Sequence, residues 1–447
     1  MSWQQVKIGS FLKRIKRPVK VDANSEYKLV TIRINHNGVS LRDMKRGSEL
    51  KSNMYEVKEG DFILSGIDAR NGAFGIIPKE LDGALVTNDF WYFDIDESVI
   101  DKHFFLELTS TNWFDEICKR GSDGTTQRIR LQKDKFFNQI ITLPKTMAFQ
   151  KELLSKITNV KTKQIELSNE ISLQKDYLAK LKQSILQDAI CGKLTEDWRA
   201  ENPDVEPASE LLKRIKAEKE QMIKEGKIRK EKPLEPITES ELPFEIPDTW
   251  QWCRLGDLCS KTGSGSTPKG GKSAYPSRGI YFLRSQNIYN DGITLDGVAF
   301  ISDKTHKSMS ATQVKQEDLL LNITGGSIGR CAMVPKEFEE ANINQHVAII
   351  RLIDKEMGNL IHSVIISNYF QQMIVKAQTG AGREGLPKNK MDQILIPIPP
   401  QKEQKIIDEI IKKSLEKCSL IEAQITANEL TAQNLLKSIL SENFNNN

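Results

Sequence analysis

The sequence predicts an α+β fold in which two mixed α/β domains are joined by two long helices that pair as an antiparallel coiled coil. Three observations support this prediction. Segments of the first half of the chain recur in the second half, a heptad pattern follows each copy, and short β-branched runs alternate with Gly, Asn and Asp turns within each copy. An internal duplication of this kind predicts a molecule with pseudo-two-fold symmetry.

The duplication can be followed along the chain by its offsets. Residues 3–11 match 250–258 at an offset of 247, segments of 57–80 match segments of 314–337 at 257, and residues 184–186 match 438–440 at 254. Because the repeated unit is a whole domain plus a helix, the pattern excludes a solenoid of short repeats.

These offsets divide the chain into six parts. We expect a first domain at 1–148, a long helix at 149–190, a charged linker with a short helix at 191–249, a second domain at 250–400, a second long helix at 401–441 and a tail at 442–447. The linker is expected to be exposed rather than part of a core. Within the domains we expect strands at 29–34, 62–64, 90–95, 280–283, 319–323 and 347–352, and helices at 102–119 and 356–377.

The long helices carry the strongest secondary-structure signal. Residues 149–190 contain neither Gly nor Pro, and apolar side chains recur in alternating steps of four and three, which is the a/d spacing of a coiled coil. The second helix repeats the pattern in phase. The expected seam residues are Leu153, Ile157, Val160, Leu167, Ile171, Leu178, Leu181, Ile185, Ile407, Ile411, Ile421, Ile425, Leu435 and Ile439.

Two seams of equal length most simply pair with each other. If a two-fold relation holds between the halves, the pairing is antiparallel and the two domains lie at opposite ends of a rod. A heptad stripe does not name its partner, so seams that face other subunits are the alternative.

The composition excludes several classes of protein. The longest apolar runs are a few residues, which excludes a membrane span, and the first residues lack a signal-peptide pattern, so we expect a cytoplasmic protein. Six Cys without a C-x-x-C pair and five dispersed His argue against a metal site. The net charge is +4, with +3 on residues 1–149, +4 on 250–400 and −4 on 191–249. This distribution is compatible with nucleic-acid binding but does not establish it.

Catalytic motifs are missing from the sequence. Residues 265–273 resemble a phosphate-binding P-loop, but five residues separate Gly265 from Gly271 where the motif needs four, and Pro268 interrupts them. The Asn/Asp-Pro-Pro-Tyr/Phe tetrapeptide of amino-methyltransferases is also missing, as is a Gly-rich turn for S-adenosylmethionine. We therefore expect no catalysis and no cofactor bound by this chain.

Polar loops with guanidinium and amide groups are the chemistry that the two domains do offer. Arg can read guanine, Asn or Gln can read adenine, and Ser, Thr and backbone N–H groups can hold phosphates. The framework segments match between the copies while the loops differ, as expected of one scaffold that reads two targets. The candidate DNA-binding residues are Lys13, Arg14, Arg33, Asn35, Asn37, Arg70, Asn71, Thr125, Gln127 and Arg128 in the first copy, and Ser266, Thr267, Lys269, Arg284, Gln286, Asn287, Thr324, Ser327, Arg330 and Arg383 in the second.

A succession of motifs in the second copy carries a family resemblance. It runs through residues 246–258, 263–268, 279–288, 318–330 and 396–404, and residues 184–194 add the exit from the first long helix. In this order and duplicated, the motifs resemble the specificity (S) subunit of type I restriction–modification systems over essentially the whole chain. The first copy departs from the pattern, because residues 142–150 replace the compact Pro-Pro-Gln closure of the second.

The resemblance implies a non-catalytic DNA-binding subunit. Each of two target-recognition domains would read one half of an asymmetric bipartite site in double-stranded DNA, and the helix pair would set the spacer. Two methyltransferase (M) subunits that carry S-adenosylmethionine would dock on the chain, and the resemblance also allows restriction (R) subunits. An alternative class is a coiled-coil scaffold whose duplicated domains bind protein partners; steep salt dependence of DNA affinity would distinguish the two.

Overall fold

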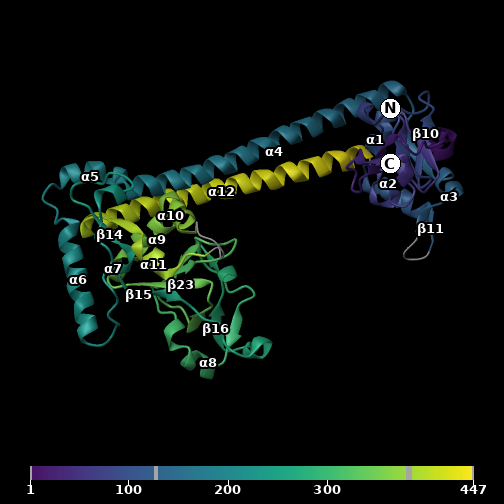
Figure 1. The fold of residues 1–447 in the computed structure, drawn as a ribbon. Helices are drawn as coiled ribbons and strands as arrows, with labels where there is room; N and C mark the ends of the chain where they lie inside the picture. Colours follow the sequence, from purple (N-terminus) through teal and green to yellow (C-terminus); the bar gives the residue numbers. More distant parts are fainter. Residues whose placement is uncertain (1–2, 125–128, 379–384, 445–447) are drawn as a thin grey trace. The chain divides into compact units, whose positions relative to one another are not determined.

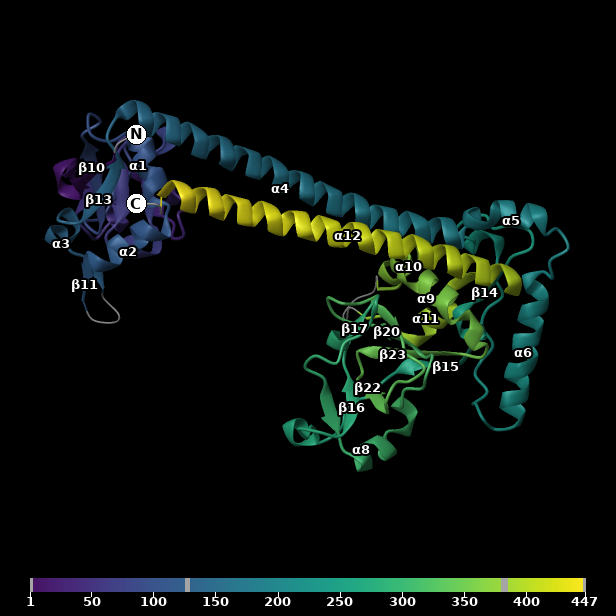
Figure 2. The same cartoon turned by 180° about the vertical axis from the view of Figure 1, so that it is seen from behind.

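The computed structural model describes residues 3–124, 129–378 and 385–444, with side chains as far as Asn434. The chain forms two compact units, the first made of Met1–Ser172 and Thr426–Asn447 and the second of Leu173–Ile425. Figures 1 and 2 show the fold of each unit from opposite sides. Among the described helices, none is both long enough and apolar enough to cross a membrane.

A four-stranded antiparallel sheet forms the centre of the first unit, in the order β2(Leu12–Ile15), β10(Phe90–Ile95), β7(Phe62–Ser65), β8(Phe74–Ile76). Successive side chains of a strand point to opposite faces. Phe62 and Phe93 therefore join one apolar core, while Ile63 and Tyr92 join a second core on the other face. Burial on both faces explains why these strands are almost continuously apolar in the sequence.

Further strands and helices complete the first unit. A five-stranded mixed sheet has the order β3(Pro18–Val19), β6(Met54–Glu56), β9(Leu85–Val86), β4(Glu26–Ile32), β5(Val39–Arg46). Two antiparallel pairs, β1(Trp3–Lys7) with β13(Ile140–Pro144) and β11(Ser122–Asp123) with β12(Arg130–Leu131), complete the strands. The helices are α1(Lys102–Thr109), α2(Asn112–Arg120), α3(Lys133–Phe137) and the first part of α4(Met147–Ile190).

The second unit repeats this topology. Its central sheet has the order β15(Cys259–Ser264), β23(Val347–Leu352), β20(Leu319–Asn322), β21(Cys331–Met333), strand for strand the order of the first unit. The other strands are β14(Gln251–Arg254) with β24(Leu395–Ile398), the sheet β19(Ala299–Ile301)–β16(Ile280–Leu283)–β22(Ala341–Ile343), and β17(Ile288–Tyr289) with β18(Gly292–Ile293). The helices are α7(Leu255–Leu258), α8(Asp303–Ser308), α9(Gly358–Ile366), α10(Asn368–Gln378), α11(Lys388–Gln393) and most of α12(Gln401–Phe444).

Each of the two helices expected inside the domains is in fact a pair. The helix expected at 102–119 divides into α1 and α2, because the hydroxyl of Thr111 accepts a hydrogen bond from the backbone N–H of Phe114 and begins a new helix. The helix expected at 356–377 divides into α9 and α10 at Ser367, whose extended backbone ends α9.

A buried aspartate occurs at the same place in both units. The Asp61 and Asp318 carboxylates accept backbone hydrogen bonds from Lys58 (2.8 Å) and Lys315 (2.7 Å). Each also forms an ion pair with an arginine, but from different strands: Arg17 follows β2, while Arg351 lies in β23 at 2.7 Å from Asp318. The duplicated framework therefore keeps the carboxylate and changes the source of its counter-charge.

The linker is not simply an exposed connection, which corrects the expectation from the sequence. Its helix α6(Ala208–Lys224) buries Ala208, Leu211 and Ile215 in the main core of the second unit. The shorter helix α5(Glu196–Glu201) contacts α12 through the buried carboxylate of Glu403. This carboxylate accepts hydrogen bonds from Thr195 at 2.6 Å, from Arg199 at 2.6 Å and from Trp250 at 2.9 Å. The short helix expected in the linker is present as α6, but what it packs against could not be inferred from the charged composition.

Helices α4 and α12 each have 44 residues. In the second unit the end of α4 runs antiparallel to the start of α12 (Figures 1 and 2), with Leu186 and Ala189 packed in one cluster with Ile407 and Ile411. The Lys182 ammonium lies 2.7 Å from the Glu422 carboxylate. The paired long helices and the two α/β units confirm the predicted fold class.

The heptad seam is less continuous than the sequence predicts. Leu153, Ile157, Ile171, Leu178, Ile407, Ile411 and Ile425 are buried, and Val160 and Ile185 are half-buried. Leu167, Leu181 and Ile421 are instead 42, 47 and 47% exposed. A straight helix has 3.6 residues per turn, so a 3.5-residue repeat drifts by about 20° per heptad and leaves the contact unless the helices supercoil. Leu435 and Ile439 lie outside the residues whose side chains are described.

Candidate nucleic-acid interface

The candidate interface lies at one end of the strands of each central sheet. In the first unit it is where β7 ends and β10 begins, and in the second where β20 ends and β23 begins. In the first unit, Gly66 directly follows β7 and donates its N–H to the carbonyl of Asp89, just before β10, at 2.7 Å. The carbonyl of Gly66 accepts the N–H of Leu131 at 2.8 Å, which fixes the β11–β12 hairpin at the same edge. We call this place the recognition edge.

The second unit repeats these two backbone contacts. Ile323 follows β20 and donates its N–H to the carbonyl of His346 at 3.0 Å, and its own carbonyl accepts the N–H of Leu386 at 2.8 Å. Gly66 and Ile323, like Asp89 and His346, are 257 residues apart, the offset of the duplication. The backbone of the recognition edge is therefore shared while its side chains differ.

Arg14 lies at the recognition edge of the first unit. Its guanidinium donates to the backbone carbonyl of Asn88 at 3.1 Å and to the Asn88 side-chain oxygen at 3.3 Å, and it lies 4.6 Å from the centre of the Trp91 ring. Burial lowers the pKa of Arg14 from its ordinary value. Beside it, Arg130 forms a 2.7 Å ion pair with Asp89. These arginines hold the edge in shape and bring positive charge to it.

Two of the loops selected from the sequence do meet in the first unit. The backbone N–H of Asn35 donates to the carbonyl of Asn71 at 2.7 Å, and that of His36 donates to Gly72 at 3.0 Å. Asn35 and His36 adopt left-handed backbone angles, with φ of 57° and 59°. The His36 ring lies so close to Gly72 that a Cβ there would come within 2.4 Å of it, so this loop contact requires glycine.

The remaining candidates of these loops have varied settings. The Arg33 guanidinium donates to the Ser40 hydroxyl at 3.1 Å, and the Asn37 amide donates to the carbonyl of Ile34 at 3.0 Å. Arg70 is half-buried, while Arg33, Asn37 and Asn71 are exposed.

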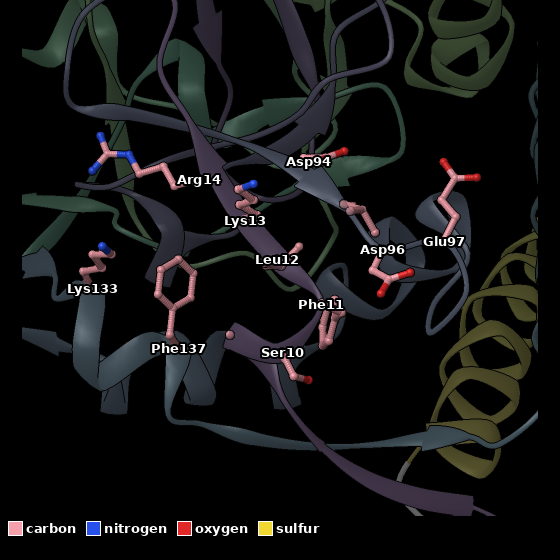
Figure 3. A pocket seen from close by; sticks show the side chains of 12 residues that line it. Ser10, Phe11, Leu12, Lys13, Arg14, Asp94, Asp96, Glu97, Lys133 and Phe137 are labelled. Atoms are coloured by element: carbon pink, nitrogen blue, oxygen red, sulfur yellow. The ribbon is translucent and has the colours of Figure 1, made fainter.

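Lys13 precedes Arg14 in β2, and both line a pocket of about 780 Å³. Lys133, Asp94, Asp96 and Glu97 also line it (Figure 3). In the sheet register, Lys13 lies opposite Asp94. Because lysines and carboxylates are mixed here, the pocket does not form the uniformly positive surface that phosphates favour.

A chain of four polar side chains follows the recognition edge of the second unit. The Thr267 hydroxyl bonds to the side-chain oxygen of Gln345, the Gln345 amide nitrogen lies 3.0 Å from Nε2 of His346, and Nδ1 of His346 lies 2.5 Å from the Thr324 hydroxyl. Gln345, His346 and Thr267 are exposed and Thr324 is half-buried. The chain joins loops after β15 and β20 to the turn before β23.

Asn287 is the candidate that the structure corrects. Its side chain is fully buried, where its oxygen accepts from the Arg284 N–H and its amide donates to the Thr294 carbonyl, both at 3.0 Å. It closes a turn and cannot reach a base. Arg284 also donates to the Gly297 carbonyl at 2.9 Å, while its neighbour Gln286 is exposed.

The other candidates of the second unit differ in how firmly they are held. The Ser327 hydroxyl accepts from the Asn322 amide at 3.1 Å, and the Arg330 guanidinium lies 4.8 Å from the centre of the Tyr289 ring. Ser266 and Lys269 are exposed. Thr125, Gln127, Arg128 and Arg383 lie outside the described residues.

Sequence reasoning missed Asn88, Gln345 and His346 as edge residues. A signal was available, because the dipeptides at 88–89 and 345–346 stand at the 257-residue offset directly before matching strands. Among the described residues no group of three or more His, Cys, Asp and Glu side chains could hold a metal ion.

Comparison with known proteins identifies the family. The model of the type I restriction modification DNA specificity domain matches residues 2–174 and 247–431. The EcoAI specificity subunit of Escherichia coli is 30% identical over 268 residues, 59% of this chain and 44% of the relative, and the EcoEI specificity subunit is 46% identical over 101 residues, 23% of this chain and 16% of that relative. The matched region thus spans less than half the length of either relative.

Solved structures share the fold at low sequence identity. A chain from a type I R-M system, studied for its complex assembly and conformational transition, has a TM-score of 0.65 at 14% identity, and the HsdS subunit from Thermoanaerobacter tengcongensis has 0.56 at 15%. Each comparison covers 99% of this chain and 97% of the other. With its two matched segments in two units of the same topology, this chain belongs to the type I restriction modification DNA specificity domain family.

Proposed function

We propose that this chain is the DNA-reading specificity subunit of a type I restriction–modification complex. Each unit contributes one target-recognition domain, and each domain reads one half of an asymmetric, bipartite site in double-stranded DNA. The chain carries out no chemistry itself.

One observation carries the proposal. The two recognition edges share their backbone contacts, at Gly66 and Ile323, but present Arg14, Asn88 and Asp89 in one unit and Thr267, Gln345 and His346 in the other. A common scaffold with different hydrogen-bonding groups is what two different half-sites require, because base edges are distinguished by their donor and acceptor patterns.

The partners and cofactor follow from the family. Two methyltransferase subunits dock on the chain and carry the S-adenosylmethionine, restriction subunits join the complex in systems that cleave DNA, and the complex acts in the cytoplasm. The long helices set the spacing between the half-sites. Apolar side chains on them, such as Ile165, Tyr177 and Leu420 at 62, 59 and 73% exposure, support a role in docking partner subunits.

The adenine methylation pattern of the cell tests this function. We expect one bipartite motif to be methylated in cells with this gene and to lose its methylation when the gene is deleted. Affinity of the assembled complex for that motif should fall steeply with salt, since phosphate contacts release counterions. An unchanged methylation pattern would contradict the proposal. The alternative of a protein-binding scaffold gains no support from the relatives above, which are themselves specificity subunits.

A further inference from the structure

We propose that Gln345 and Asn88 are the equivalent base-reading side chains of the two domains, and that Gln345 is held in the orientation that selects adenine. This inference rests on the proposed function and specifies how the recognition edge performs it. Neither Gln345 nor Asn88 was among the residues selected from the sequence.

The two amides occupy the same place in the duplicated fold. Asn88 and Gln345 are 257 residues apart, and each directly precedes the residue whose carbonyl anchors the recognition edge, Asp89 or His346. Both side chains are exposed. Side chains at this place extend beyond the ends of the strands, where they are accessible to DNA.

The placement of the Gln345 amide, with Nε2 toward His346 and Oε1 toward Thr267, sets the direction of its hydrogen bonds. Its Nε2 can only donate, so Nε2 of His346 accepts that bond, and a neutral ring then carries its proton on Nδ1 and donates to the Thr324 hydroxyl. Oε1 of Gln345 accepts from the Thr267 hydroxyl. His346, Thr324 and Thr267 are therefore positioning residues that fix which way the amide points.

The groups that Gln345 has left match adenine. An amide oxygen has two lone pairs and an amide nitrogen two hydrogens, and this network uses one of each. One acceptor and one donor of the amide remain for a ligand. In the major groove adenine presents N6–H as a donor and N7 as an acceptor, the pair that a Gln or Asn amide bonds bidentately.

The amide oxygen of Asn88 also accepts a hydrogen bond from a neighbouring side chain, but the donor differs from that of Gln345. Its Oδ1 accepts from the Arg14 guanidinium at 3.3 Å, and Arg14 also binds the Asn88 backbone carbonyl and packs on the Trp91 ring. In both units the amide oxygen is thus oriented by a fixed neighbour. Because the Asn88 side chain is shorter and is held by a different donor, its amide is presented to DNA differently from that of Gln345.

The substitution Gln345→Glu tests the inference in the assembled complex. A glutamate retains the shape and the acceptor but loses the donor for N7, and a carboxylate accepts instead from N4 of cytosine. The assay is competition binding on DNA in which each position of both half-sites is varied in turn. We expect preference at one position of one half-site to change from adenine toward cytosine, with about 10- to 100-fold loss on the original base.

A matched variant and a positioning variant serve as controls. Asn88→Asp, which keeps its contact with Arg14, should alter one position of the other half-site only. Thr324→Val should weaken discrimination at the Gln345 position more than it weakens affinity for unrelated DNA, a difference that a merely structural role would not produce.

Each remaining outcome overturns the inference. Unchanged base preference in Gln345→Glu, or an equal loss of affinity for every sequence with a smaller salt slope, would show that Gln345 does not read a base. A wild-type complex without any bipartite site would overturn the proposed function as well, so the two failures are distinguishable.

Discussion

Asp408 is a carboxylate on α12 that faces a cavity of about 350 Å³ lined also by Asn359, His362, Ser363 and Lys412. Burial raises the pKa of Asp408 to about 6, although a hydrogen bond from Asn359 acts in the opposite direction. Burial also lowers the pKa of His362, so its ring is neutral at pH 7 and supplies no counter-charge. Asp408 is therefore protonated up to a higher pH in the folded state than in the unfolded state.

Asp408→Asn should stabilise the second unit in a pH-dependent way. Because the folded pKa lies above the unfolded one, the wild-type chain loses stability as pH rises from about 4 to about 6, and the loss is complete at higher pH. The variant removes that loss, so we expect a gain of about 1 kcal/mol at pH 8, discounted for partial exposure, and little gain at pH 4. Urea unfolding at both pH values measures it, with the exposed Glu409→Gln as control. An equal gain at both values would contradict the assignment.

Single-residue roles were only partly predictable from the sequence. Arg14, Asn35, Asn71, Thr267 and Thr324 are brought to or near the recognition edges, because strand pairing joins segments that are far apart in the chain. Residue type alone could not distinguish Asn287, which is buried and closes a turn, from the exposed amide of Gln345. Burial of a loop amide depends on which neighbours fold over it, and those neighbours are distant in sequence.

At the scale of elements, α6 shows how a charged segment can belong to a core. Its Leu211 and Ile215 are 3 and 4% exposed, while Lys213 and Arg214 between them face solvent. One apolar stripe along a helix is enough to attach it to a core when the rest of its surface carries charge. The linker therefore contributes to the stability of the second unit.

Leu211→Ala should lower the free energy of unfolding of the second unit by about 2–4 kcal/mol, since it removes a buried side chain and leaves a cavity. Lys213→Ala on the exposed face should change it by less than about 0.5 kcal/mol. Urea unfolding followed by tryptophan fluorescence measures both, because Trp250 and Trp252 are buried in this unit. If the linker were a free tether, the two variants would unfold alike.

Elements with a long, regular pattern were predicted best. The heptads predict long helices at 149–190 and 401–441, and the structure has 44-residue helices there, because a local repeat suffices to define a long helix. The breaks at Thr111 and Ser367 were missed, since an internal cap depends on one side chain within an otherwise helical pattern. Strand order within the sheets needed the structure, because strand pairing joins residues far apart in the chain.

At the scale of the whole molecule, the duplication was visible in the sequence and explains the repeated sheet order. The chain conserves a scaffold twice, including the buried aspartates Asp61 and Asp318, and varies the groups at the recognition edge. One consequence is that specificity and spacing are separable properties. In the proposed function, the first belongs to side chains at 88–89 and 345–346, and the second to the helices.

Deletion of one heptad, residues 161–167 of α4, tests that separation. Seven residues shorten a helix by about 10 Å while keeping the a/d phase, so the seam can form again one heptad further along. We expect the complex to methylate sites with an altered spacer and unchanged half-sites, measured from the methylation pattern of cells that carry the variant. A two-residue deletion is the control: it turns the following part of the helix by about 200°, so the seam faces away from its partner and methylation should be lost at every spacer. Altered half-site sequences with the original spacer would show that the helices do not set the spacing.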